Sequence, residues 1–154
     1  MTHSTIIDSA IGPLTLVERE GALVSLSFGA HGKGGDPTPL LARAMSQLNE
    51  YFAGERRAFD LPLAPTGSDF QLACWRALAE IPYGETRSYG EQARRLGRPD
   101  RARAVGAANG ANPIAIILPC HRVIGADGSL VGFGGGLETK RRLLDLEAGI
   151  LTLV

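Results

Sequence analysis

Residues 114–123 read Ile-Ala-Ile-Ile-Leu-Pro-Cys-His-Arg-Val, and the rest of the chain can be arranged around them. The five apolar residues from Ile114 to Leu118 are typical of a short strand that is buried on both faces. They lead directly to Cys120 and His121. A cysteine beside a histidine at the end of a buried strand is a candidate nucleophile. The alternative is a core cysteine next to a histidine whose hydrogen bonds are already satisfied.

A nucleophilic Cys120 needs a base. A free thiol, with a pKa of about 8.5, is only a small fraction thiolate at neutral pH. His121 is the adjacent candidate, but neighbouring side chains on an extended segment point in opposite directions. We therefore expect a water molecule between the two groups. Glu147, near the end of a predicted helix at Leu137–Ala148, is the candidate carboxylate that holds the histidine tautomer.

The segment before this stretch predicts two short helices joined by a tight turn. Ser88 and Glu91 have the spacing of a capping box, which opens a helix that ends at Gly97. Pro99 suits the first turn of a second helix, which we expect to continue to about Ala108. Together they predict a helix-turn-helix at about residues 88–109, a motif that also occurs in proteins that bind no nucleic acid.

Positive charge gathers in the same segment, although the formal net charge of the whole chain is zero. Six arginines, opposed only by Glu91 and Asp100, give residues 87–103 a net charge of +4; they are Arg87, Arg94, Arg95, Arg98, Arg101 and Arg103. Such a cluster either meets the phosphates of nucleic acid or forms a solvated helical face. The second helix is rich in alanine and glycine, so its backbone can approach DNA or another helix closely.

A further helix is predicted upstream, where Ser68 and Gln71 form another capping box and apolar residues recur to about Glu80. Cys74 lies on this helix, and we expect it to pack in the core. Two prolines in residues 60–67 indicate a linker before it.

The residues before the linker predict an antiparallel sheet covered by one helix. We expect strands at Ser4–Asp8, Leu14–Arg19 and Ala22–Phe28, with a hairpin turn at Glu20-Gly21. Apolar residues then recur at helical spacing from 40 to 52. The fold class is therefore α+β: an N-terminal antiparallel sheet with a covering helix, then a mainly helical part with a helix-turn-helix and an active-site strand or loop.

The composition excludes several classes of protein. A chain of 154 residues with 44% apolar residues fits one domain, or two small ones that share an interface. No export signal or long apolar run is apparent, so we expect a soluble, cytoplasmic protein without a membrane partner. Two cysteines and three histidines are too few for a disulfide framework and suit a structural zinc site poorly, so we expect no metal.

Several motifs, in matching order and with matching gaps, resemble the methylated-DNA–protein-cysteine methyltransferases, or O6-alkylguanine-DNA alkyltransferases. They are Tyr83-Gly-Glu-Thr, Ser88-Tyr89, the arginine- and alanine-rich run 101–110, Asn112-Pro113, residues 119–123 and the glycine run 134–137. The resemblance covers the second half; the first half shares only its plan and the Gly12-Pro13-Leu14 turn. It implies a ribonuclease-H-like α/β support domain at 1–64 and a DNA-binding and alkyl-transfer domain at 68–154.

The resemblance also implies a function, direct reversal of DNA damage. O6-alkylguanine, and also O4-alkylthymine, would be flipped out of the duplex, and the alkyl group would pass irreversibly to Cys120, once per molecule and without a cofactor. His121, Glu147 and a water would form the relay to the thiol, and Asn112 would hold the helix-turn-helix against the active-site strand. Double-stranded DNA would be bound through its minor groove by a monomer, and cooperative binding is left open.

Individual DNA-contacting and pocket residues follow from the same motifs. Arg103 would enter the base stack in place of the flipped nucleotide, and Tyr89 would crowd the neighbouring phosphate. Further DNA contacts are expected from Ala102, Gly106, Ala107 and Arg122. The substrate pocket is expected to involve Phe133, Gly134, Gly135 and Val123.

Three other functions are weighed against this one. A lesion-binding module without chemistry would lack the acceptor cysteine, which is present here as Cys120. A transcription regulator of this kind carries a cysteine-rich zinc domain upstream, which these residues do not include. A cysteine hydrolase would leave the arginine-rich helix unexplained.

Overall fold

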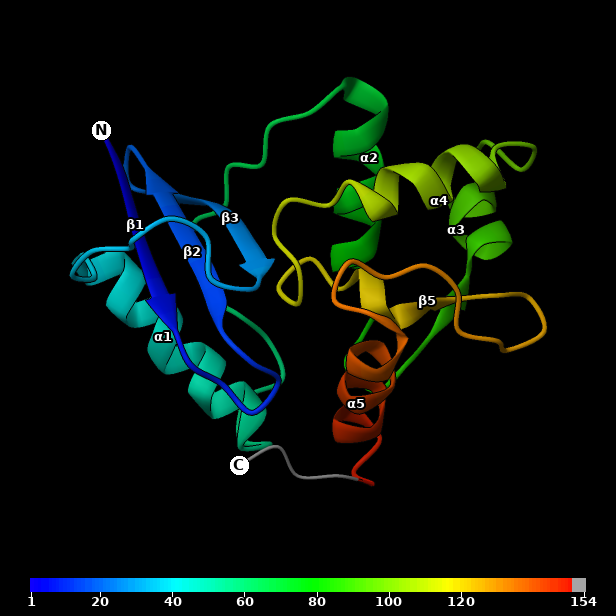
Figure 1. Cartoon of the computed structure of the whole chain (residues 1–154). Coiled ribbons are helices and arrows are strands. Elements are labelled where there is room, and N and C mark those ends of the chain that lie inside the picture. The colour runs from blue at the N-terminus through cyan, green and yellow to red at the C-terminus, as the bar shows by residue number, and fades with distance from the viewer. Residues whose placement is uncertain (151–154) are drawn as a thin grey trace.

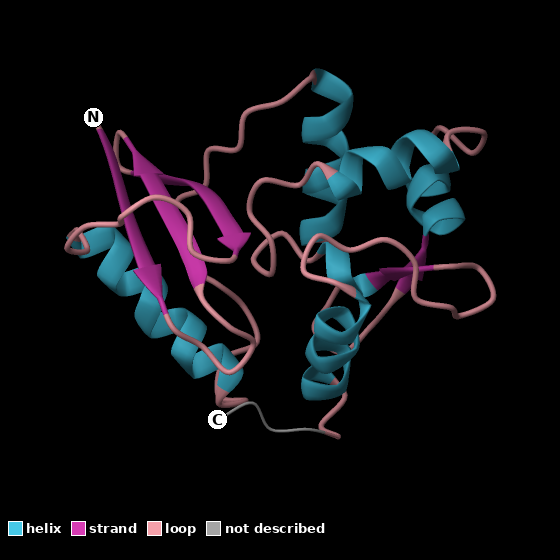
Figure 2. Cartoon of the chain, in the orientation of Figure 1, coloured by secondary structure: helices cyan, strands magenta, loops and turns pink. Residues whose placement is uncertain are grey.

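The computed structural model of the protein describes residues 1–150, and within them the architecture is α+β, as predicted. The last four residues of the predicted second domain, 151–154, lie outside the described residues. Figure 1 shows a sheet and one helix from the first half of the chain beside a group of helices from the second half. In Figure 2 the three long strands lie together on one side of the molecule.

The sheet follows the predicted strands closely. β1 (Thr2–Ile7), β2 (Leu14–Arg19) and β3 (Ala22–Phe28) are antiparallel neighbours in that order. Glu20 and Gly21 have φ values of 51° and 81°, and positive φ at both positions is what a type I′ hairpin turn requires.

One helix, α1 (Pro39–Phe52), covers a face of this sheet. Thr38 caps it by accepting a hydrogen bond from the Leu41 amide. Its buried stripe, which recurs at helical spacing, consists of Leu41, Ala44, Gln47, Leu48, Tyr51 and Phe52. The polar Tyr51 on this stripe is fully buried.

Both predicted capping boxes are present in the second half. The Ser68 pair begins α2 (Asp69–Ala79), and the Ser88 pair begins α3 (Tyr89–Arg95). In each pair the serine hydroxyl accepts from a backbone amide while the partner side chain accepts from the serine amide. Cys74 on α2 is fully buried, which confirms its predicted packing role.

Two further parts of the second half differ from the prediction. α4 (Ala102–Gly110) begins three residues later than predicted, because Pro99 lies in a turn before the helix. β4 (Arg87–Ser88) and β5 (Val123–Ile124) form a short parallel pair that was not predicted. The last helix, α5 (Leu137–Glu147), agrees with its prediction.

Buried hydrogen bonds hold α3 and α4 together as a helix-turn-helix. The side-chain amides of Gln92 and Asn109 exchange hydrogen bonds of 3.1 and 2.8 Å. Behind them, the indole of Trp75 on α2 donates to the backbone oxygen of Ala108 at 2.8 Å. Each of these buried polar groups therefore has a partner, and the two short helices form one packed unit.

The predicted strand at Ile114–Leu118 is wrong. Only Ile114 forms a β-bridge, to Leu26 of β3, and the chain then turns. The Leu118 amide donates to the Ile114 oxygen at 3.0 Å, and Ile116 has a φ of 72°. The residues are mostly buried, as the apolar run predicted, but a buried run does not by itself specify an extended backbone.

The two halves share one hydrophobic core. Leu26 donates to the Pro113 oxygen at 2.9 Å and accepts from the Ala115 amide at 3.1 Å, so the segment before Cys120 pairs with the edge of β3. Figure 1 shows this segment between the sheet and the helices. Among the described helices, none has the length and apolar character needed to cross a bilayer.

Candidate active site

Cys120 begins a single 3-10 turn, Cys120–Arg122, that follows Pro119. In a 3-10 turn successive side chains leave the backbone about 120° apart, whereas on the extended segment that we predicted they would point in opposite directions. Asn112 supports this segment at both ends: its side-chain NH2 donates to the Leu118 oxygen at 2.7 Å, and its side-chain oxygen accepts from the Ile114 amide at 3.0 Å. Cys120 is half-buried, whereas His121 is fully buried.

His121 and Glu147 form a buried pair, as the sequence predicts. The His121 Nε2 lies 2.6 Å from the Glu147 Oε2. Because an ionised carboxylate only accepts, Nε2 carries the hydrogen and Nδ1 is left with its lone pair. The Nδ1 is buried and has no hydrogen-bond partner among residues 1–150. The arrangement therefore provides an oriented base next in sequence to the thiol.

The Glu147 carboxylate is surrounded by donors. Arg122 donates to it twice, from Nε to Oε1 at 2.7 Å and from Nη2 to Oε2 at 3.0 Å, and the Gly84 amide lies 3.3 Å from Oε1. The Tyr51 hydroxyl donates to Oε2 at 2.6 Å. Burial alone would raise the pKa of Glu147, but the hydrogen bonds and charges of His121 and Arg122 outweigh it and lower the pKa to about 2.

The structure corrects the prediction that Arg122 contacts DNA. Its side chain is buried, donates to Glu147 and to the Ile81 oxygen at 2.7 Å, and has its guanidinium carbon 5.7 Å from the centre of the Tyr83 ring. A guanidinium engaged in this way inside the protein does not reach the DNA backbone, so the predicted DNA contact of Arg122 is wrong. Its charge acts on Glu147 instead.

Burial sets the protonation of both groups at rest. It lowers the pKa of His121, although Glu147 opposes this effect, so the imidazole is neutral at pH 7. Burial also raises the pKa of the Cys120 thiol, which the Asn112 amide and the charge of Lys140 only partly offset. The resting pair is thus a thiol and a neutral histidine.

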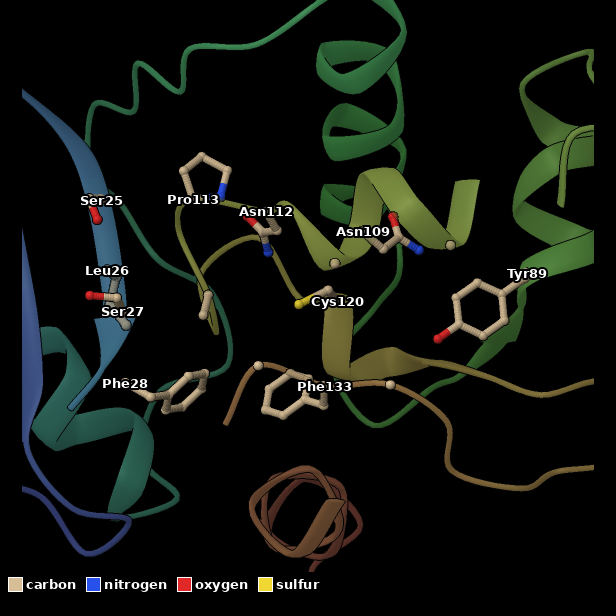
Figure 3. A pocket seen from close by; sticks show the side chains of 15 residues that line it. Ser25, Leu26, Ser27, Phe28, Tyr89, Asn109, Asn112, Pro113, Cys120 and Phe133 are labelled. Atoms are coloured by element: carbon tan, nitrogen blue, oxygen red, sulfur yellow. The ribbon is translucent and has the colours of Figure 1, made fainter. Parts of the chain in front are cut away.

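A cavity of about 440 Å³ opens at Cys120 between the two halves (Figure 3). Figure 3 shows the Cys120 side chain between Asn112 and Phe133. Phe28 of β3 forms part of the wall, with its ring in edge contact with Phe133 at a centroid distance of 5.3 Å. The other lining residues are Ser25, Leu26, Ser27, Tyr89, Gly106, Asn109, Gly110, Pro113, Ala115, Gly132 and Gly134.

Two predicted pocket residues lie away from this cavity. Val123 is fully buried in β5, where its oxygen accepts a 2.7 Å hydrogen bond from Lys140. Gly135 lies behind the wall, and a Cβ on it would come within 3.0 Å of the Phe28 ring. Val123 is therefore a core residue, and Gly135 permits the close approach of Phe28.

The predicted DNA-contacting residues of α4 lie on one accessible stretch. Arg103 and Ala107 are exposed, and Ala102 and Gly106 are half-buried. A Cβ on Gly106 would be 3.7 Å from the ring of Tyr89, whose hydroxyl donates to the Val131 oxygen at 3.3 Å. Tyr89 and α4 thus border the mouth of the cavity together.

Protein-family models match nearly the whole chain. The model described as "6-O-methylguanine DNA methyltransferase, ribonuclease-like domain" matches residues 2–65, and the one described as "6-O-methylguanine DNA methyltransferase, DNA binding domain" matches residues 69–149. The chain belongs to the methylated-DNA–protein-cysteine methyltransferase family.

Relatives of the same name are similar over almost their whole length. The methylated-DNA–protein-cysteine methyltransferase of Mycobacterium tuberculosis is 54% identical, covering 96% of this chain and 93% of that protein. That of Methanosarcina acetivorans is 50% identical, covering 94% of this chain and 97% of that protein. The crystal structure of Mycobacterium tuberculosis OGT in complex with DNA has a TM-score of 0.87, with 54% identity over 96% of this chain and 94% of that one.

Three residues of this methyltransferase were not predicted as parts of the site. Tyr51 and Phe28 come from the first half, and no local pattern relates them to residues near Cys120. Lys140 is fully buried and donates to the Val123 and Val131 oxygens at 2.7 and 2.9 Å, which ties the loop before α5 to β5. A lysine within an otherwise exposed helical turn gives no sign of burial in the sequence. Clusters of three or more acidic, histidine or cysteine side chains that could hold a metal are not found in residues 1–150.

Proposed function

We propose that this protein repairs DNA by taking the alkyl group of O6-alkylguanine onto Cys120 in a single, irreversible transfer. One observation carries the proposal: Cys120 lies on the wall of a cavity and is followed in sequence by a buried histidine that is oriented by Glu147 and has a free Nδ1. This is the arrangement that an activated thiol nucleophile requires. The family to which the chain belongs supports the same chemistry.

The transfer follows from the protonation states. A water between Cys120 and His121 carries the thiol proton to Nδ1, and Glu147 stabilises the imidazolium that forms. The thiolate attacks the alkyl carbon, so that an S–C bond forms while the C–O6 bond breaks. Guanine leaves with the electron pair of that bond and takes up a proton. A thioether has no easy hydrolytic reversal, so one molecule repairs one lesion.

Duplex DNA is the partner, and its damaged base is flipped into the cavity. The support comes from the exposed arginines of residues 94–103 and from the DNA complex solved for the similar Mycobacterium tuberculosis protein. The small residues of α4 suit a close approach in the minor groove, with Arg103 filling the gap in the base stack and Tyr89 crowding the adjacent phosphate. O4-alkylthymine presents a similar exocyclic alkoxy group and is a second substrate.

The protein acts as a monomer without a cofactor, and its two halves have separate tasks. Residues 68–150 carry the helix-turn-helix, the thiol and the relay histidine, whereas residues 1–64 form a ribonuclease-H-like support. A lesion-binding module without chemistry is less well supported, because such a module has no use for a thiol beside an oriented base.

The first experiment is intact-mass analysis after stoichiometric mixing with a short duplex that contains one O6-methylguanine. We expect a gain of one methyl group that maps to Cys120. Cys120→Ser should gain none, and the matched variant Cys74→Ala, which removes the buried thiol of α2, should still gain it. Lesion-selective binding without any gain in mass would instead establish the binding module.

A further inference from the structure

The first half of the chain contributes a hydroxyl group to the buried relay. Tyr51 lies on α1, 96 residues before Glu147, and its side chain is fully buried. Its hydroxyl donates to the Glu147 Oε2 at 2.6 Å, the same oxygen that accepts from His121 at 2.6 Å. The ring is held by edge contacts with Phe52 and Tyr83 at 5.5 and 6.2 Å between centroids. The packing of the ring therefore fixes the position of the hydroxyl group.

Tyr51 and His121 compete for one carboxylate oxygen. Each hydrogen bond to an ionised carboxylate stabilises its charged form and makes it a weaker base. With Arg122 also donating to Oε2, three donors share this oxygen. A weaker base draws the imidazole hydrogen less strongly and stabilises an imidazolium less, so His121 rests neutral with its Nδ1 available.

We propose that Tyr51 is a positioning residue of the relay, which holds the Oε2 of Glu147 and limits its basicity so that His121 rests as a neutral base toward Cys120. The role of Tyr51 in catalysis rests on the proposed function. Its influence on the protonation of His121 is a property of the resting protein and can be measured without DNA. This influence makes the relay depend on the position of α1, because the hydroxyl of Tyr51 bonds the Glu147 carboxylate of α5 across the two halves.

Other charged and titratable groups also act on this pair. Burial disfavours protonation of His121, Glu147 favours it, and the charges of Arg122 and Lys140 disfavour it. Tyr83 lies beside Tyr51 and Arg122, and the guanidinium carbon of Arg57 lies 5.2 Å from the centre of the Tyr83 ring. These groups are unchanged in a Tyr51→Phe variant, so the difference between variant and parent reports the Tyr51 hydroxyl alone.

The test is an NMR titration of the histidine side chains in the full chain. Three histidines are present, and His3→Gln and His31→Gln variants assign the signal of His121. Tyr51→Phe keeps the ring and removes the donor, so the carboxylate binds the imidazolium more strongly. We expect the pH at the midpoint of the His121 titration to rise by about one unit, which is a tenfold change in proton affinity. The acidic limb of the methyl-transfer rate should move to higher pH by the same amount.

Two controls separate this role from a purely structural one. Tyr83→Phe removes a neighbouring hydroxyl but no hydrogen bond to Glu147, so the His121 midpoint should stay at its parental value. Incorporation of 3-fluorotyrosine keeps every hydroxyl but makes it a stronger donor, so the midpoint should fall; this measurement applies even where Tyr51→Phe does not fold.

An unchanged His121 midpoint in both the Phe and the fluorotyrosine proteins would overturn the proposal, and so would a rate lowered equally at all pH values with the midpoint unmoved. If the parent protein transfers no methyl group, the proposed function is refuted. A His121 titration midpoint that rises in Tyr51→Phe and falls in the fluorotyrosine protein would still establish the effect of Tyr51.

Discussion

Glu147 is the residue on which most of the buried polar network converges, and its ionisation links stability to pH. Its pKa is about 2 in the folded protein against an ordinary 4.5, so the unfolded chain binds more protons between these values. By linkage the carboxylate contributes about 3 kcal/mol to the free energy of unfolding. This contribution is fully present above about pH 4.5 and is lost as the pH falls toward 2.

Glu147→Gln should therefore be most harmful at neutral pH. The variant leaves Arg122 buried without a counter-charge, and we expect a loss of about 3–5 kcal/mol in the free energy of unfolding at pH 7. Urea unfolding followed by the fluorescence of Trp75 measures this difference, which should shrink as the pH falls below about 4.5. Glu138→Gln, an exposed change on the same helix, should show little effect at any pH. A difference that is independent of pH would mean that Glu147 is not ionised in the folded protein.

Some residues of the site could be predicted from the sequence, and others could not. Cys120, His121 and Glu147 were predicted from a motif, and the structure brings the last two together. Arg122 was misassigned because a basic residue beside a nucleophile looks the same in sequence whether its charge faces DNA or a buried carboxylate. Tyr51 was missed because helical periodicity places it on the buried face of α1 without showing what lies opposite.

The segment between Asn112 and Cys120 pairs with β3 only around Leu26, and the Asn112 side chain bonds its backbone at both Ile114 and Leu118. We predict that Asn112→Ala, which removes both hydrogen bonds to this segment, lowers the free energy of unfolding by about 1–3 kcal/mol. It should also slow methyl transfer about tenfold, since the thiol then occupies its productive position less often. Urea unfolding and single-turnover kinetics test the two effects.

Asn49→Ala, at an exposed position of α1, is the matched control and should leave both quantities nearly unchanged. Full transfer activity in Asn112→Ala would show that the turn keeps its shape without the amide.

Elements with local signals were predicted well, and those defined by distant partners were not. Capping boxes and hairpin turns are encoded within four residues, so α2, α3 and the turn between β2 and β3 appear where expected. The apolar run at 114–118 carried no such signal. Its backbone follows from pairing with Leu26, nearly ninety residues earlier, and from Asn112.

At the level of the whole molecule, the exposed arginines and the cavity mouth should act together on duplex DNA. The side chain of Arg103 is proposed to fill the gap left by the flipped base and so to offset part of an unstacking cost of a few kcal/mol. Arg103→Ala removes this side chain. We expect methyl transfer from duplex DNA to slow about tenfold or more, which corresponds to about 1.4 kcal/mol.

Transfer from O6-methylguanine in a single strand should change much less, because little stacking opposes entry of the base. Arg141→Ala, which removes an exposed arginine on α5, controls for the loss of one positive charge. An equal slowing on both substrates would assign Arg103 to general phosphate binding instead.

The edge of β3 has two covers that come from different parts of the chain. Near Leu23 the cover is the segment 62–64, and near Leu26 it is the segment 113–115. During synthesis the first cover leaves the ribosome well before the second. In that interval the strand edge at Leu26 is open to pairing with other chains, which is a recognised route to aggregation. The amount of protein that a cell recovers in folded form should therefore depend on how quickly translation reaches the residues just before Cys120.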